Sequence, residues 1–345
     1  MKPFIFSLLL LVLLGCHREM ISVGEGVSDT FFLRNNGASM RGLVEGNTAS
    51  KTFLLCVHGG PGSSSFFFNS EFISTHLEDT FAVVYWDQRN AGASQGGANV
   101  DHLTLPQMTE DLEQLVAVLK LRYGQDISIF VMGHSFGGLL STSFFTKEGN
   151  QEQVKGWIFV DGSHHYLLND TLTRNMLLSE GRAQIALGNH IAEWQQIVDY
   201  CEAHPGPFDM EVSSQLNSFA HDAETYYPEV EYNSILQAIR ENALKYNWPI
   251  LPTYQNSMFS GNAPFNRDLR EADFRAGLAR VTVPTLLMFG RHDFICPPGH
   301  GDDLMARIGS SHKFMVISPI SGHTPMFQDE AWFCAEVRKF MREFR

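Results

Sequence analysis

The residues of this chain with the clearest chemical potential are Gly133, Ser135 and Gly137, which form the pattern Gly-x-Ser-x-Gly. The apolar run 127–132 before them predicts a buried strand, and residues from 139 onward predict a helix. A strand-to-helix turn this sharp strains the backbone at the serine and exposes its hydroxyl, and side chains in place of the glycines would collide with the adjoining strand and helix. The pattern therefore predicts a nucleophile at Ser135; the alternative is a structural turn whose serine caps the helix.

An acid and a base follow in the order that such a nucleophile needs. Asp293 lies just beyond the apolar run 283–290, and His323 lies beyond the last predicted strand, 314–317. With both groups at strand ends, His323 would take the hydroxyl proton and return it to the leaving group. Asp293 would hold the ring tautomer and stabilise the imidazolium.

Each of these assignments has a rival. Asp161 also ends a predicted strand, 156–160, and could supply the acid or cap the next helix. The chain has 14 histidines, of which three others are candidates for the base: His164, His165 and His292. Only His323 follows the last strand. His134, beside the nucleophile, is expected to face away from the side of attack and to serve packing or hydrogen bonding.

The glycine-rich stretch 58–62, His-Gly-Gly-Pro-Gly, directly follows a continuous apolar run at 53–57. Acyl transfer needs bare backbone N–H groups where a tetrahedral oxyanion forms. By position, the amides of Gly60 and Phe136 are the predicted donors. A flexible loop is the alternative. The stretch lacks the Gly-Lys-Ser/Thr ending of a phosphate-binding loop, which excludes that nucleotide-binding motif.

The elements around these motifs predict an α/β fold with a mostly parallel sheet. A hairpin is expected over 30–44, further strands over 81–86 and 156–160, and helices over 106–123 and 331–344. Strand, crossover helix and strand in succession imply parallel pairing. Asp87 and Arg89, two apart on one loop, are expected to pair and hold that loop.

Between two stretches of this pattern, residues 163–276 contain helical patches, several prolines and no clear buried strand. Since the α/β pattern resumes afterwards, the segment is interpreted as an inserted helical lid over a core made of 30–162 and 277–345. Such a lid would shape a substrate pocket and limit access by water. The alternative is an unrelated helical domain.

The amino-terminal residues predict export. Lys2, the apolar stretch 4–14 and the ending Leu-Gly-Cys at Cys16 are similar to a bacterial lipoprotein signal over 1–15. Residues 16–29 would form a tether, and lipidated Cys16 would anchor the protein to the outer membrane or cell envelope without a spanning helix. The alternative is an ordinary secretory signal with a coincidental cysteine.

The composition of the chain limits the kinds of partner that the protein is expected to bind. A net charge of −13 over 345 residues argues against nucleic acid and against anionic lipid, although acidity also aids solubility. The remaining cysteines show no paired spacing, so neither a disulfide framework nor a zinc site is indicated: Cys56, Cys201, Cys296 and Cys334. No metal or organic cofactor is expected, because side chains and backbone amides alone can supply every group that the reaction needs. The sequence does not specify an oligomeric state.

The stretches 58–62, 87–94, 133–138 and 290–297 together resemble the proline iminopeptidase branch of the α/β-hydrolase superfamily. The resemblance implies an α/β-hydrolase fold and an aminopeptidase that releases N-terminal residues, preferentially proline, from small peptides. The chain departs from the branch at the elbow, where it has Gly-His-Ser-Phe-Gly instead of Gly-Gly-Ser-Trp-Gly, and at Asn90, where the branch usually has glycine.

Two hydrolase hypotheses follow, and the pocket distinguishes them. An aminopeptidase needs a carboxylate cluster in the lid to pair with the substrate's ammonium group. An esterase, lactonase or amidase for a small apolar substrate predicts an aromatic pocket without an acidic anchor. A ligand-binding protein on a hydrolase fold is a third hypothesis, which would usually lose a triad residue or an oxyanion glycine. Dehalogenases and epoxide hydrolases need a carboxylate where Ser135 stands.

Overall fold

The computed structural model describes residues 23–94, 99–228, 230, 240, 244–245 and 262–345. The predicted signal, Cys16 and part of the tether lie outside these residues, as does much of the stretch between 229 and 261. The described chain contains an eight-stranded sheet in the order β1-β2-β4-β3-β5-β6-β7-β8. The strands are β1 Val27–Asn35, β2 Ala38–Gly46, β3 Thr52–Val57, β4 Ala82–Trp86, β5 Ser128–His134, β6 Gly156–Val160, β7 Thr285–Gly290 and β8 Lys313–Ser318.

The sheet is antiparallel only at the β1 edge. β1 pairs with β2 and β2 with β4 in antiparallel register, and every pair from β4 to β8 is parallel. The β1–β2 hairpin turns at Asn36 and Gly37, both of which have positive φ, as a two-residue hairpin turn requires. This confirms the predicted α/β fold with a mostly parallel sheet.

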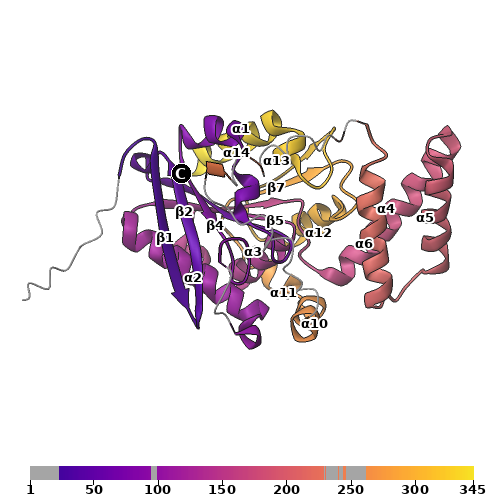
Figure 1. Cartoon of the computed structure of the whole chain (residues 1–345), viewed down its shortest axis with the longest axis horizontal. Helices are drawn as coiled ribbons and strands as arrows, with labels where there is room; N and C mark the ends of the chain where they lie inside the picture. Colours follow the sequence, from indigo (N-terminus) through magenta and orange to yellow (C-terminus); the bar gives the residue numbers. More distant parts are fainter. Residues whose placement is uncertain (1–22, 95–98, 229, 231–239, 241–243, 246–261) are drawn as a thin grey trace, which may run out of the picture.

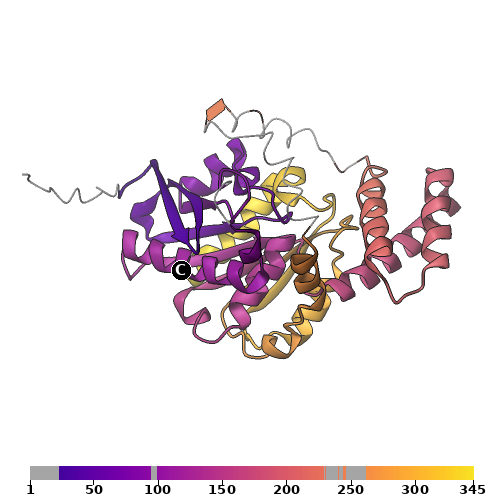
Figure 2. The same ribbon diagram turned by 60° about the horizontal axis from the view of Figure 1, so that its bottom comes forward.

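Helices cover both faces of the sheet (Figures 1 and 2). The main ones are α2 Leu105–Tyr123, α3 Phe136–Thr146, α4 Tyr166–Leu187, α5 Ile191–Ala203, α6 Met210–Glu224, α10 Ala263–Glu271, α12 Gly299–Arg307 and α14 Glu330–Phe344. Shorter turns are η1 Thr48–Ser50, η2 Ser65–Phe68, α1 Glu71–Ile73, η3 Ser74–Glu78, η4 Val100–His102, η5 Gln151–Gln153, α11 Arg275–Leu278 and α13 Pro325–Gln328.

The strands at the centre of the sheet are mostly apolar because both of their faces are buried. In β3, Phe53 and Leu55 join a core cluster with α2 and α3, whereas Leu54 and Cys56 join a second cluster with α14. Successive side chains of a strand point to opposite faces, so an uninterrupted apolar run is what this position requires. The thiol of Cys56 is buried.

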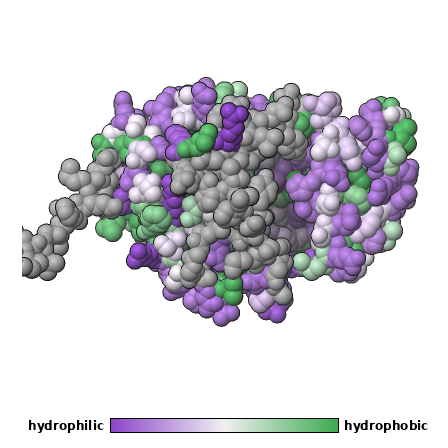
Figure 3. All heavy atoms as spheres, viewed as in Figure 1, coloured by the Kyte–Doolittle hydropathy of each residue, from purple (hydrophilic) through white to green (hydrophobic). Residues whose placement is uncertain are grey.

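Helices α4, α5 and α6 form the insert between β6 and β7 (Figures 1 and 2). They gather at one end of the molecule, away from β1 and β2, around a cluster of their own that includes Leu177, Trp194 and Leu216. Phe294, from the loop after β7, belongs to the same cluster and ties the insert to the core. Their outward surface is mostly hydrophilic (Figure 3). The buried side chains of α10, which follows the insert, join the cluster of α2 and α3 instead.

The predicted pairing of Asp87 with Arg89 is wrong. Arg89 is fully buried and forms two hydrogen bonds with Asp111 of α2, from Nε at 2.5 Å and from Nη2 at 2.6 Å. The Asp87 carboxylate instead accepts hydrogen bonds from Ser64 Oγ at 2.7 Å and from the Ala93 amide at 2.7 Å. The two side chains therefore anchor the loop after β4 to different elements.

Breaking this buried ion pair should strongly destabilise the fold. Arg89→Met leaves Asp111 buried without its cation, and we expect the free energy of unfolding to fall by about 3–5 kcal/mol. Urea titration followed by circular dichroism measures the change. The matched control is Arg182→Ala, which breaks the exposed pair with Glu202 and should change stability by less than about 1 kcal/mol. Equal effects in the two variants would contradict the expectation.

Candidate active site

Ser135 lies between β5 and α3 with φ 56° and ψ −122°. A non-glycine residue with this backbone conformation is strained, and such strain persists where the surrounding structure enforces it. A Cβ on Gly133 would lie 2.3 Å from the Gly137 carbonyl oxygen, and one on Gly137 would lie 2.1 Å from the Val57 carbonyl oxygen. The flanking glycines are therefore required by close backbone approach, as the sequence predicts.

Asp293 and His323 meet beyond the ends of β7 and β8. Asp293 is fully buried, and its Oδ1 accepts hydrogen bonds from the amides of Ile295 and Cys296, both at 2.8 Å. Its Oδ2 lies 3.1 Å from His323 Nδ1. With Nδ1 bonded in this way, Nε2 of His323 is the nitrogen left to exchange a proton with a substrate or nucleophile.

Charge and burial compete at this pair. Burial alone would lower the pKa of His323, but the charge and hydrogen bond of Asp293, together with the charge of Glu224, outweigh it and raise that pKa. Burial alone would raise the pKa of Asp293, yet His323 and the amide donors lower it. The arrangement thus favours an ionised carboxylate beside the imidazole.

Asp161, the rival acid, occupies a different position. It is fully buried, has φ 39°, and accepts a hydrogen bond from the Gly290 amide at 2.7 Å. Burial, and then the charge of Asp293, raise its pKa well above the ordinary value. The raised pKa favours the neutral form of Asp161 beside Asp293, and Asp293 is the one that contacts the imidazole.

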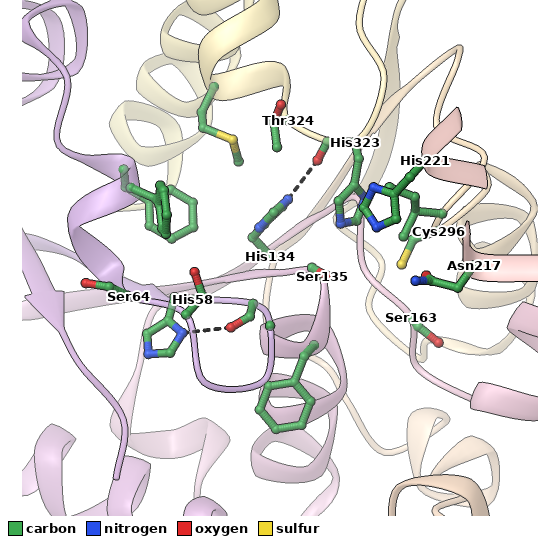
Figure 4. Close-up of a pocket in the computed structure, with 18 of the residues that line it drawn as sticks. His58, Ser64, His134, Ser135, Ser163, Asn217, His221, Cys296, His323 and Thr324 are labelled. Carbon is green, nitrogen blue, oxygen red and sulfur yellow. Dashed lines mark hydrogen bonds between the residues drawn. The ribbon is translucent and has the colours of Figure 1, made fainter. Parts of the chain in front are cut away.

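The cavity that contains Ser135 and His323 has a volume of about 410 Å³ (Figure 4). Gly60 and Phe136 also line it, whereas the three rival histidines do not: His164, His165 and His292. Within the described part of the chain, no hydrogen bond joins Ser135 Oγ to His323 Nε2. Catalytic hydrogen bonds in unliganded enzymes are often long and shorten when substrate binds, so the predicted roles of these two residues require a side-chain movement that brings the two atoms together.

The loop after β3 passes very close to the serine. A Cβ on Gly59 would lie 2.7 Å from Ser135 Cβ, so only glycine permits this approach. Gly60 has φ +116°, a conformation that also favours glycine. Phe136 is the first residue of α3, so its N–H lies in the turn where amides lack an intrahelical acceptor. Both residues with predicted oxyanion donors thus line the cavity that contains the serine.

A buried histidine fixes that loop, a role that sequence reasoning missed. Nδ1–H of His58 donates to the Gly59 carbonyl at 2.8 Å, and its Nε2 accepts the Gln88 amide at 3.1 Å. The Gln88 side chain in turn donates to the His58 carbonyl at 2.8 Å. Burial lowers the pKa of His58, so the ring is neutral and this tautomer is fixed. The only sequence signal was a histidine opening the glycine stretch.

His134 lines the same cavity, so the expectation that it faces away from the side of attack is wrong. The expectation of a hydrogen-bonding role is confirmed, because its Nε2 donates to the His323 carbonyl at 2.7 Å (Figure 4). Burial, and then the neighbouring His323, lower its pKa to about 3, so the ring stays neutral. His134 thereby holds the backbone of the proposed base.

Features that would suggest other functions are not found among the described residues. They contain no cluster of three or more histidine, cysteine or acidic side chains arranged to hold a metal ion. The four described cysteines are free and buried. No helix in the described ranges combines the length and apolar character needed to cross a bilayer.

Comparison with known proteins agrees with this geometry. The profile of the alpha/beta hydrolase family matches residues 54–336. A proline iminopeptidase of Thermoplasma volcanium is 24% identical over 283 residues, covering 81% of this chain and 85% of that protein. The proline iminopeptidase structure from Mycobacterium smegmatis superposes with a TM-score of 0.63 at 17% identity, covering 92% of this chain and 98% of that one. An esterase from Exiguobacterium antarcticum gives 0.59 at 18% identity, with coverage of 91% and 99%.

Proposed function

Since this chain belongs to the alpha/beta hydrolase family, we propose that it is a serine hydrolase that cleaves carboxylic ester or amide bonds through an acyl-enzyme on Ser135. The observation that carries the proposal is the His323–Asp293 pair, which opens into the same cavity as the strained Ser135. The residue types and their arrangement match the requirements of acyl transfer.

In the proposed mechanism, Ser135 Oγ attacks the carbonyl carbon of the substrate while His323 Nε2 takes the hydroxyl proton. The amides of Gly60 and Phe136 donate hydrogen bonds to the oxyanion of the tetrahedral intermediate. The imidazolium then protonates the leaving group, and Asp293 stabilises its charge. Water attacks the acyl-enzyme by the same route, with His323 again as base, and releases the acid.

The lining of the cavity favours a neutral, largely apolar substrate. Aromatic and thioether side chains form much of it: Phe67, Phe68, Phe136, Tyr166, Met326 and Phe327. Among the described residues, no aspartate or glutamate lines it. Such a pocket suits the ester, lactone or amide of an uncharged acyl group better than a substrate with a free ammonium group.

An aminopeptidase of proline iminopeptidase type is the second candidate, and the coverage of the Thermoplasma relative favours it. This activity requires a carboxylate that reaches the substrate's amine. Glu224 of α6 is buried near the site, but its carboxylate accepts the His323 amide at 3.1 Å. Glu193, Glu202 and Glu211 do not line the cavity, and Glu229 lies outside the described residues.

A substrate panel separates the two candidates. Purified protein is assayed with 4-nitrophenyl butyrate and with the 4-nitroanilides of proline and alanine. We expect hydrolysis of the ester with little release of nitroaniline, because no described carboxylate lines the cavity to pair with the ammonium group. Efficient cleavage of the proline anilide would establish the aminopeptidase instead, and turnover of none of the three would contradict both.

We also propose that the protein is an exported lipoprotein anchored through Cys16, on the strength of the amino-terminal sequence pattern. Expressed with its signal in a bacterial host, the wild-type protein should sediment with membranes. Cys16→Ser should move it to the soluble envelope fraction, because the acyl chains have no other attachment site. Membrane association of the variant would contradict the proposal.

A further inference from the structure

The cavity beside Ser135 has two walls of opposite chemical character. One wall is apolar: Phe67, Phe68, Met326 and Phe327. The other comes from the segment after β6, from the lid helices and from the loop after β7, and beside Ile295 and Cys296 it carries polar groups: Ser163, Asn169, Asn217 and His221. Figure 4 shows Ser163, Asn217 and His221 together on one side of Ser135, opposite His58 and Ser64.

Asn217 and His221 are four residues apart on α6, so they share a face of that helix. Both side chains line the cavity and remain exposed to solvent, and neither has a hydrogen-bond partner among the described residues, so both are accessible to a substrate. Burial, and then the neighbouring His323, lower the pKa of His221, so its ring is neutral at physiological pH. A neutral imidazole and an amide each offer both a donor and an acceptor.

Ser163 and Asn169 add two further groups to this wall. Ser163 is 4% exposed and its Oγ has no hydrogen-bond partner, which is costly for a buried hydroxyl. The Asn169 side-chain amide lies 2.9 Å from Nε2 of the buried His300, which leaves its other polar atom for the cavity. His300 thereby holds the side chain of Asn169 in place.

Building on the proposed function, we propose that these four residues form a polar subsite for an uncharged amide or hydroxyl group of the substrate. The apolar wall would take the hydrocarbon part. Among the described residues, no aspartate, glutamate, lysine or arginine lines the cavity, so an ammonium group has no carboxylate partner there and a carboxylate has no lysine or arginine partner. The substrate class is therefore a neutral ester or amide that carries a second, uncharged hydrogen-bonding group.

Two pairs of isosteric esters test the subsite. The acyl pair consists of the 4-nitrophenyl esters of N-acetylglycine and 4-methylpentanoic acid. Their uncatalysed hydrolysis rates are subtracted from the measured rates. The alcohol pair is the butyrates of 2-acetamidoethanol and 4-methylpentanol. In at least one pair, the wild-type protein should prefer the amide member by about fivefold to tenfold in kcat/KM, as expected for one or two added hydrogen bonds.

Substitutions in the polar wall test whether that wall causes the preference for the amide substrates. Asn217→Leu removes the amide at nearly constant volume and should bring the ratio close to one; His221→Phe should act in the same direction. Gln215→Leu, on the same helix but outside the cavity, should keep the wild-type ratio. Wild-type ratios of one or less in both pairs, or a preference that survives both cavity variants, would overturn the subsite.

Failure of the proposed function would give a different result from failure of the subsite alone. If the wild-type protein hydrolyses none of the four esters and Ser135 is not labelled by a fluorophosphonate, both proposals fall. If it hydrolyses all four without preferring the amide members, serine hydrolase activity stands and the polar subsite is rejected.

Discussion

Replacing Ser135 by alanine should lower kcat for ester substrates by about four to six orders of magnitude. The variant cannot form the acyl-enzyme, so only binding and the oxyanion donors would remain to accelerate hydrolysis. Alanine lacks only the hydroxyl, so the strained backbone at this position should persist and the protein should fold. Initial rates measured with 4-nitrophenyl butyrate give the effect, and circular dichroism and the urea midpoint confirm folding.

Two measurements make this prediction specific to the nucleophile. A fluorophosphonate probe should label the wild-type protein and leave Ser135→Ala unlabelled, because the reagent needs an activated hydroxyl. Ser179→Ala removes an exposed hydroxyl of α4, far from the cavity lining, and should retain wild-type rates. Retained turnover in Ser135→Ala would remove this serine from the mechanism.

The architecture was accessible from sequence because several strands are buried on both faces. Residues 53–57 and 286–289 are apolar without interruption, and each run leads into a polar motif beyond its carboxyl end. In a parallel sheet those ends meet at one edge, so the proximity of Asp293 and His323 follows from the order of elements. The prediction needed no information on side-chain geometry.

Contacts that depend on how separate elements pack against one another could not be predicted from the sequence. Arg89 binds Asp111, 22 residues further along the chain on α2, and no spacing rule identifies that partner. His134 is the last residue of β5. Its hydrogen bond with the His323 carbonyl forms only because the loop after β8 passes beside it. Asn217 likewise lines the cavity because of how the lid packs on the core. Its helix alone does not say which face turns inward.

The pair of buried carboxyl groups leads to a prediction with the second largest effect. Asp293→Asn should lower kcat by about three to four orders of magnitude, because an amide cannot stabilise the imidazolium and favours the wrong ring tautomer. Asp161→Asn should cost less than about tenfold. Because the raised pKa of Asp161 favours its neutral form, asparagine is a close substitute and can keep the acceptor for the Gly290 amide. Steady-state kinetics of both variants measure the difference.

The pH profile distinguishes the role of Asp293 from a merely structural one. His323 must be neutral to act as base, and Asp293 helps to raise its pKa, so kcat/KM should fall as pH decreases through a value above ~6.5. Without the carboxylate, the imidazolium loses its stabilising charge, and the acid limb of Asp293→Asn should move to lower pH. Asp161→Asn should leave the limb close to its wild-type position, because it removes no charge. A collapse of activity in Asp161→Asn with a retained rate in Asp293→Asn would transfer the role of the acid to Asp161.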